Sequence, residues 1–193
     1  MDLTLLQQLE QLAAFGRETD ARETERARRM LNITPDTGRL LWILVKATRA
    51  RRILEVGTSN AYSTLWLADA ARLNQGRVTT LEQDAAKIAL ARENLRRAGL
   101  LETVAIHEGR AAESLAGLAG PFDLVFLDAD REHYLDYLEP ILAKLGSGGL
   151  LITDNATSHA HELAAYLATV QTHPQLFAVT LPVGNGELVA VKH

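Results

Sequence analysis

The chain has 193 residues, of which 47% are hydrophobic and 23% are charged, so it is long enough to bury a core as one globular domain over residues 1–193. It contains no cysteine, which excludes disulfides, thiolate metal ligands and cysteine nucleophiles and fits a cytoplasmic location. The net charge of −4 disfavours nucleic acid as a partner, and the longest apolar runs, such as Leu40–Val45, are far too short to span a membrane.

The first predicted element is a helical segment over residues 2–31. Its apolar side chains follow a helical spacing at Leu3, Leu6, Leu9, Leu12 and Phe15. Gly16 is expected to divide the segment into two helices, the second of which is rich in charged residues and ends near Leu31. We expect the apolar stripe to support a symmetric homodimer. The alternative is that the stripe packs on its own domain.

A second N-terminal helix is predicted over residues 35–49, with Thr34 as its cap and Pro35 in its first turn. From residue 51 onward, short apolar runs alternate with longer amphipathic ones. The predicted strands are Ile53–Val56, Arg77–Glu82, Val104–His107, Phe122–Asp128, Gly148–Thr153, Leu176–Leu181 and Leu188–Val191. The predicted helices between them are Tyr62–Leu73, Ala85–Ala98, Ala112–Leu118, Tyr134–Lys144 and His161–Gln171.

This alternation predicts an α/β fold, because strands joined through helices form a parallel sheet. Gly184-Asn185-Gly186 is a strong hairpin turn between the last two strands. We therefore expect a mostly parallel, seven-stranded, Rossmann-like sheet over residues 51–193 that closes with an antiparallel hairpin, preceded by N-terminal helices over residues 1–50.

Two features near the start of this core favour a nucleoside ligand. The loop Glu55-Val56-Gly57-Thr58-Ser59-Asn60-Ala61-Tyr62-Ser63 leads from the first strand into a helix, where a polar group would meet free backbone amides and the positive end of the helix dipole. Gly57 would allow close approach of the backbone. Glu82 ends the second strand, where an acid can accept both ribose hydroxyls. The alternatives are a plain tight turn and a solvated strand-end carboxylate.

Four polar side chains lie at or just beyond the ends of the fourth and fifth strands: Asp128, Asp130, Asp154 and Asn155. In an open parallel sheet these strand ends share one crevice, in which ligands bind. Carboxylate and amide oxygens form a ligand set that suits Mg²⁺ or a similar divalent cation. The alternative is that Asp154 and Asn155 only cap the loop before the next helix.

From about Pro35 to its C-terminus, the chain resembles the cation-dependent O-methyltransferases, a family that includes the catechol and caffeoyl-CoA enzymes and many bacterial relatives. The segments that carry the resemblance are ILEVGTSNAYS, TTLEQD, EGRAAESL, FDLVFLDADREHY, GGLLITDN and LPVGNGELVAVKH. Together they cover most of the chain in the order of the family, and a closing hairpin is the ending expected of such a fold.

The resemblance implies that S-adenosylmethionine (SAM) is the cofactor. It implies contacts from the loop of Glu55, Gly57 and Thr58 to the methionine part, from Ser63 to its carboxylate, from Glu82 and Gln83 to the ribose, and from Arg110 and Ala111 to the adenine. It also implies that Asp128 serves a divalent cation and the SAM amino group, and that Asp154 and Asn155 complete the metal ligands. The cation would hold a vicinal dihydroxy aromatic, whose deprotonated oxygen attacks the methyl group in line.

Four departures from the family pattern stand out. Ala61 replaces a glycine, and a positive φ there would cost alanine roughly 1 kcal/mol. Arg110 replaces an acid that often contacts adenine. Arg131 replaces the lysine that serves as general base. Because arginine stays protonated, Arg131 can orient or stabilise an oxyanion but cannot abstract a proton; we assign it to catalysis together with Asp128. The long segment that follows the Asp-Asn pair in the family is missing, and residues 156–160 lead almost directly into a helix.

The sequence thus predicts SAM-dependent, cation-assisted O-methylation of a small catechol-like acceptor. A metal-independent methyltransferase and a non-catalytic SAM-binding protein that acts through a partner are the alternatives. His159 and His161 add a further open point, because one of them could replace the missing base or bind the metal. The alternative is a solvated pair at a helix start.

Overall fold

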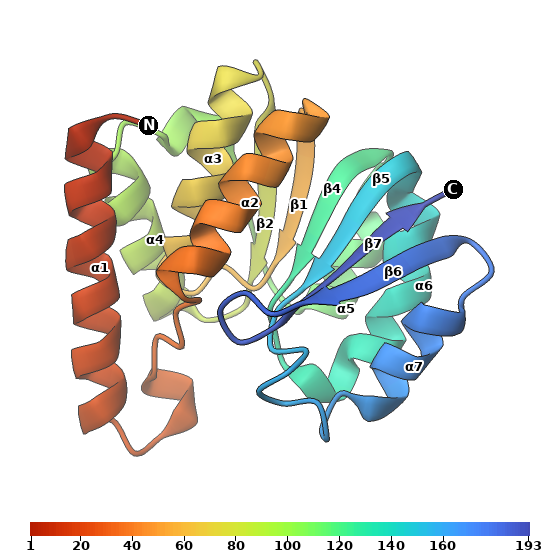
Figure 1. Cartoon of the computed structure of the whole chain (residues 1–193). Coiled ribbons are helices and arrows are strands. Elements are labelled where there is room, and N and C mark those ends of the chain that lie inside the picture. The colour runs from red at the N-terminus through yellow and green to blue at the C-terminus, as the bar shows by residue number, and fades with distance from the viewer.

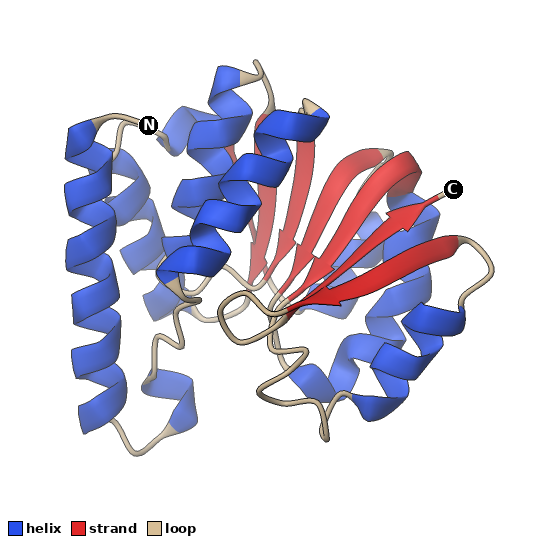
Figure 2. Ribbon diagram, in the orientation of Figure 1, coloured by secondary structure: helices blue, strands red, loops and turns tan.

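The structure is a computed structural model that describes residues 1–193, and its helices flank one central sheet (Figures 1 and 2). The helices are α1 (Leu3–Arg22), α2 (Pro35–Thr48), α3 (Tyr62–Leu73), α4 (Ala85–Arg97), α5 (Ala111–Gly117), α6 (Tyr134–Lys144) and α7 (Ala164–Thr172). Short 3₁₀ turns are η1 (Arg26–Arg28), η2 (Leu101–Thr103) and η3 (Arg131–His133). The strands are β1 (Arg52–Val56), β2 (Arg77–Glu82), β3 (Val104–Glu108), β4 (Phe122–Leu127), β5 (Leu145–Thr153), β6 (Leu176–Leu181) and β7 (Glu187–Lys192).

The seven strands form one sheet in the order β3-β2-β1-β4-β5-β7-β6. The strands β1 to β5 are parallel to one another, whereas β7 is antiparallel to both β5 and β6. The predicted fold class, including the antiparallel C-terminal hairpin, is confirmed. The strand order reverses between β1 and β4, and the crevice at the carboxyl ends of such strands is where open α/β sheets bind ligands.

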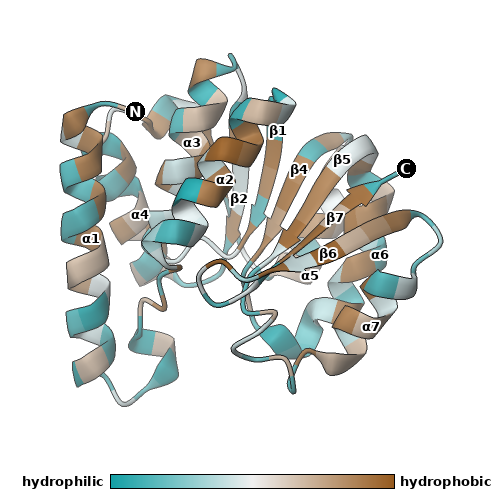
Figure 3. Cartoon of the chain, in the orientation of Figure 1, coloured by the Kyte–Doolittle hydropathy of each residue, from teal (hydrophilic) through white to brown (hydrophobic).

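The two faces of the sheet carry separate hydrophobic cores, because successive side chains of a strand point to opposite faces. In β1, Ile53 packs on the side covered by α1, α2, α3 and α4, and Leu54 packs on the side of α5, α6 and α7. Figure 3 shows the same arrangement as apolar strands enclosed between helices. Burial on both faces explains why the strands read as short continuous apolar runs.

The N-terminal helix α1 is continuous from Leu3 to Arg22, so the expected break at Gly16 is wrong. A Cβ on Gly16 would lie 2.4 Å from the amide nitrogen of Asn32. The glycine therefore makes room for Asn32, whose Nδ2 donates to the Leu12 carbonyl at 3.1 Å. The predicted helical continuation to residue 31 is also wrong, since residues 23–33 contain only the short turn η1.

Residues 23–33 instead return toward the sheet and end beside the loop that follows β1. Both carboxylate oxygens of Asp20 accept backbone hydrogen bonds, from Met30 N at 2.6 Å and from Leu31 N at 3.0 Å. The Ser59 hydroxyl donates to the Met30 carbonyl at 2.8 Å. These contacts hold the segment over the carboxyl ends of the strands.

The apolar stripe of α1 does not form one face. Leu9 and Leu12 are buried in the domain's own core, whereas Leu3 is 79% exposed. In a helix of about 3.6 residues per turn, a step of three residues turns by about 300°, which is less than a full turn. Side chains at a strict three-residue spacing therefore lie on different sides of the helix. The homodimer stays a prediction, for which light scattering is the direct test. No helix combines the length and apolar character needed to cross a membrane.

In the core, two element boundaries differ from the sequence prediction by three residues, and the others differ by at most one. Strand β5 begins at Leu145 rather than Gly148, because Leu145 already pairs with Phe122 before an irregularity in the register. Helix α7 begins at Ala164 rather than His161. The residues before Ala164 form hydrogen-bonded turns instead of a regular helix: Thr157 N and Ser158 N donate to the Asn185 carbonyl of the hairpin turn, and Leu163 N donates to the His159 carbonyl.

Candidate active site

A single large cleft of about 1080 Å³ lies at the carboxyl ends of β1, β2, β4 and β5. It brings together every predicted site residue except Glu55: Gly57, Thr58, Ser63, Glu82, Gln83, Arg110, Ala111, Asp128, Arg131, Asp154 and Asn155. The sheet topology thus gathers residues separated by almost 100 positions in the chain into one site.

The loop after β1 fits against the loop after β4 only because residue 57 is glycine. Gly57 has φ +104°, and a Cβ on it would lie 2.0 Å from the Asp128 carbonyl oxygen. Immediately before α3, the backbone is also unusual: Ala61 has φ +68° at the N-cap of that helix. The strain anticipated for alanine at this position is therefore present, at roughly 1 kcal/mol.

Glu55 lies behind this loop and does not line the cleft. It is fully buried, and its carboxylate accepts hydrogen bonds of 2.6 Å from the hydroxyls of Ser63, Thr64 and Thr80. Burial is the main cause that raises its pKa from 4.5 to about 7, and the three hydroxyls oppose this shift. Glu55 thus fixes β1, β2 and the start of α3 relative to one another.

Ser63 lines the cleft, but its hydroxyl donates a hydrogen bond to Glu55. Its backbone N–H has no acceptor in the protein, as expected for the first turn of a helix. The group that Ser63 offers to an anion is therefore its amide, supported by the positive end of the α3 dipole.

Glu82 is held rigidly at the end of β2. Its Oε2 accepts from Ser59 N at 2.8 Å, and its Oε1 accepts from Gln83 N at 2.9 Å and Asp84 N at 3.0 Å. A carboxylate has about four lone-pair positions, so acceptor capacity remains for a ligand hydroxyl. The carboxylate also ties the loop after β1 to the loop after β2.

Asp128, Asp154 and Asn155 meet in the part of the cleft below β4 and β5. The Asn155 amide nitrogen donates to Asp154 Oδ2 at 3.0 Å and lies 3.5 Å from Asp128 Oδ1. Burial, followed by the charge of Asp154, raises the pKa of Asp128 well above its usual value. Burial is also the largest cause of the raised pKa of Asp154. These two carboxylates therefore need a compensating positive charge or a proton.

Sequence reasoning assigned no role to Glu187, the first residue of β7. It is fully buried, and its Oε1 accepts from the Thr37 hydroxyl at 2.7 Å. Asp154 Oδ1 and Glu187 Oε2 are buried oxygens without a donor, and one proton held between the two carboxyls would partner both. Burial and the neighbouring charge of Asp154 raise the pKa of Glu187 to about 10, in agreement with a shared proton.

The donor set fits a hard cation in its chemistry. A cation bound at Asp154 Oδ1, a buried oxygen without a donor, would take the place of the proton shared with Glu187, and Asp128 supplies a second carboxylate at the same place. The amide oxygen of Asn155 faces the Ser158 hydroxyl at 3.2 Å, while the nitrogen faces the carboxylates. A half-turn of the amide would present the oxygen instead. No group of three His, Cys, Asp or Glu side chains in the chain has the arrangement of a metal site.

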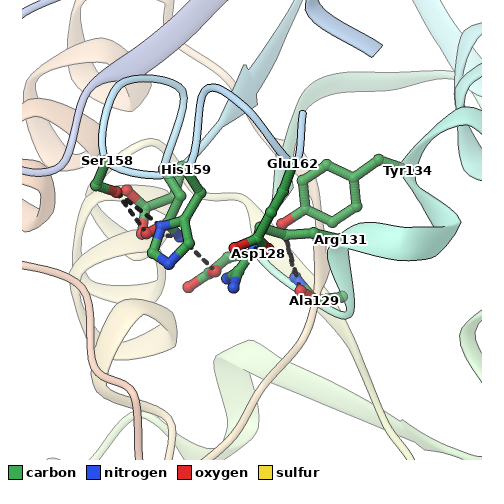
Figure 4. A network of polar contacts seen from close by, with 9 residues as sticks. Asp128, Ala129, Arg131, Tyr134, Ser158, His159 and Glu162 are labelled. Carbon is green, nitrogen blue, oxygen red and sulfur yellow. Dashed lines mark hydrogen bonds and ion pairs between the residues drawn. The ribbon is translucent and has the colours of Figure 1, made fainter. Parts of the chain in front are cut away.

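Arg131 lies next to these carboxylates, at the start of η3. Its Nε donates to Glu162 Oε2 at 2.8 Å, and the hydrogen bond from Arg131 is the largest cause of the lowered pKa of Glu162. Figure 4 shows Asp128, Arg131 and Glu162 gathered in one network with His159. The Tyr134 hydroxyl fixes the loop between Asp128 and Arg131, since it accepts from Ala129 N at 3.1 Å.

The two histidines have different positions. His159 lines the cleft, and its Nδ1 lies 2.9 Å from the Ser158 hydroxyl. His161 is exposed and does not line the cleft. Of the two, only His159 is placed to contact a ligand.

Sequence reasoning also missed the N-terminal wall of the cleft and one buried amide. Arg26 and Met30 line the cleft, although this part of the chain was expected to belong to a charge-rich helix that ends near Leu31. Asn60 is fully buried with an unpartnered Nδ2. Its place in the loop between Gly57 and Ser63 was the available signal, whereas no periodicity in residues 23–33 indicates where that segment lies.

Known proteins resemble this chain in both sequence and architecture. The sequence profile described as O-methyltransferase matches residues 6–186. The chain belongs to this O-methyltransferase family. A catechol O-methyltransferase from Mycobacterium tuberculosis is 40% identical over 156 residues, which span 80% of this chain and 69% of that protein.

Two solved structures extend the O-methyltransferase likeness to the fold. Cofactor-bound Rv0187 from MTB is 34% identical, with a TM-score of 0.81 over 94% of this chain and 88% of that one. The O-methyltransferase from Bacillus cereus in complex with SAH is 28% identical, with a TM-score of 0.79 over 100% of this chain and 92% of that one. The family predicted from the sequence is confirmed.

Proposed function

We propose that this O-methyltransferase transfers the methyl group of SAM to one hydroxyl of a small vicinal dihydroxy aromatic, with the assistance of a divalent cation, Mg²⁺. The observation that carries the proposal is that one cleft holds both a nucleoside-type subsite at Glu82 and a pair of buried carboxylates at Asp128 and Asp154. The SAH bound by the Bacillus cereus enzyme and the name of the Mycobacterium tuberculosis relative support it.

The residues of the loop after β1 and of β2 would bind the cofactor. The free amide of Ser63 at the start of α3 suits the SAM carboxylate. Glu82 has acceptor capacity left for a ribose hydroxyl. Arg110 and Ala111, at the start of α5, line the adjacent part of the cleft and would contact the adenine. Asp128, just after β4, would bind the SAM amino group.

In the reaction, a lone pair of the acceptor oxygen forms a bond to the methyl carbon of SAM as the carbon–sulfur bond breaks. That bonding pair goes to sulfur and leaves SAH, while the hydroxyl proton passes to solvent. Asp128, Asp154 and Asn155 would hold the cation, which when bound lowers the pKa of a catechol hydroxyl. Arg131 stays protonated, so its part is to stabilise the anionic oxygen rather than to accept the proton.

The test is methyl transfer to isomeric diols, measured by mass spectrometry. Catechol carries adjacent hydroxyls that can both reach one cation, whereas resorcinol, its 1,3-isomer, cannot present them together. We expect methylated catechol as the product and little methylated resorcinol. Equal rates on the two isomers, or no transfer to either, would contradict the proposal.

A metal-independent O-methyltransferase is the second candidate. It is favoured by the orientation of Asn155, whose amide nitrogen faces the carboxylates, and by the pairing of Asp154 with Glu187. In that enzyme the Asp154–Glu187 pair would keep its shared proton and would only hold β7 against the loop after β5. Transfer that continues in a chelator distinguishes this candidate from the first.

A further inference from the structure

One edge of Arg131 is left open toward the cleft. Its side chain is only 12% exposed, and its Nε is used by Glu162. The two terminal nitrogens of the guanidinium donate to no acceptor in the protein, although Arg131 lines the cleft. A largely buried guanidinium that retains free donors is suited to a planar anion, since two parallel N–H groups match the two oxygens of a carboxylate.

A second arginine side chain lines the same cleft without a hydrogen-bond or ion-pair partner. Arg26, in η1, makes no side-chain hydrogen bond or ion pair. Arg26 and Arg131 line the cleft that also holds Asp128. The two arginines therefore face the same cleft although they lie on segments distant in sequence.

Arg131 and Arg26 supply positive charge at the acceptor end, where Asp130, Glu132 and Asp136 also line the cleft. A divalent cation would balance the carboxylates of Asp128 and Asp154, and Glu162 balances Arg131. Arg26 then has no countercharge among its contacts. Because this pairing of charges includes the bound divalent cation, the inference rests on the function proposed above.

From this arrangement we propose that the preferred acceptors are acidic catechols, in which a carboxylate on the ring or on a short side chain pairs with the open edge of Arg131. Arg26, in η1, adds electrostatic attraction for this carboxylate from the N-terminal wall of the cleft. The guanidinium at this position is then a specificity determinant for the substrate's anionic group.

The test compares an acid with its neutral isostere. The probes are 3,4-dihydroxybenzoate and 3,4-dihydroxybenzamide, which share the diol and the ring and differ in charge. The readouts are the ratio of their kcat/KM values and, independently, the ratio of their Kd values measured by calorimetry on the SAH-loaded protein with Mg²⁺. We expect the wild-type protein to prefer the acid by about 10- to 100-fold, as for a hydrogen-bonded charged group.

Variants assign the preference to its residue. Arg131→Gln is expected to bring both ratios close to 1, and Arg131→Lys to leave an intermediate ratio, because a point charge lacks the paired donors. Arg26→Gln is expected to lower the ratios by a smaller factor, since Arg26 is exposed. Lys87→Gln is the matched control: it removes a positive charge that α4 contributes to the cleft wall and is expected to leave both ratios unchanged. Retained SAH binding shows that each variant is folded.

The outcomes separate this inference from the proposed function. A wild-type ratio near or below 1, as repulsion by Asp130, Glu132 and Asp136 in the cleft would produce, overturns the inference while methylated catechol still supports the function. An acid preference that Arg131→Gln does not reduce also overturns it. If no diol is methylated, the function fails, and the calorimetric ratios still decide whether Arg131 selects a carboxylate.

Discussion

Glu55→Gln separates the electrostatic cost of a buried carboxyl from its hydrogen bonds. Glu55 is fully buried, and burial raises its pKa from 4.5 to about 7. Below pH 4.5 the carboxyl is protonated in both the folded and the unfolded protein, so its ionisation does not lower the free energy of unfolding. Between pH 4.5 and about 7 the folded protein holds the proton more tightly, so stability falls as the pH rises. At 1.36 kcal/mol per pKa unit, the full loss is about 3 kcal/mol.

The assay is urea unfolding of the wild-type protein and of Glu55→Gln at pH 4.5 and at pH 8. Glutamine cannot ionise, and the hydroxyls of Ser63, Thr64 and Thr80 can rotate to suit its amide. The variant is therefore expected to gain about 3 kcal/mol relative to the wild type between the two pH values. Titrating groups that do not interact with Glu55 cancel in this double difference. A difference in unfolding free energy that does not change with pH would refute the argument.

Three further predictions concern the cleft. Gly57→Ala should weaken SAH binding by about 100-fold, because its Cβ would lie 2.0 Å from the Asp128 carbonyl and displace that loop by about 1 Å. Gly99 also has a positive φ but has open space around it, so Gly99→Ala should bind SAH normally in the same calorimetric assay. Glu82→Gln should raise the Kd for SAH by about 10- to 100-fold through loss of a charged acceptor, and an unchanged Kd would remove Glu82 from the ribose subsite. Millimolar Mg²⁺ should raise the Tm of the wild-type protein by a few degrees through ligand linkage, about 1–3 kcal/mol, and an equal rise in Asp154→Asn would place the cation elsewhere.

The convergence of Gly57, Glu82, Asp128 and Asp154 could be predicted from the sequence. Each follows a short apolar run, and runs separated by helices become parallel strands whose carboxyl ends lie at one edge of the sheet. For residues of this kind, chain order is sufficient to bring them together. The same reasoning gave the antiparallel hairpin from its Gly-Asn-Gly turn.

To predict the contact between Asp154 and Glu187, the register of two antiparallel strands has to be known. Thr153 pairs with Leu188 across β5 and β7, so the next residue on each strand end meets its counterpart. The turn at Gly184–Gly186 could have indicated this pairing. The direction in which the Asn155 amide points depends on local hydrogen bonds that no sequence pattern encodes.

The N-terminal wall of the cleft could not be predicted from periodicity. Residues 23–33 are charged and lack a regular apolar spacing. Their position is fixed by single contacts, such as those of Asp20 with Met30 and of Asn32 with the groove left by Gly16. Contacts of this kind depend on tertiary structure and leave no repeating signal in the chain.

Methyl transfer from SAM to catechol, followed by mass spectrometry in EDTA and again after Mg²⁺ is restored in excess, tests the central claim most directly. Buried carboxylates at Asp128 and Asp154 that hold the cation predict no transfer in EDTA and full recovery with Mg²⁺, and they predict that Asp154→Ala stays inactive under both conditions. Undiminished transfer in EDTA would contradict the account and would leave a metal-independent O-methyltransferase in its place.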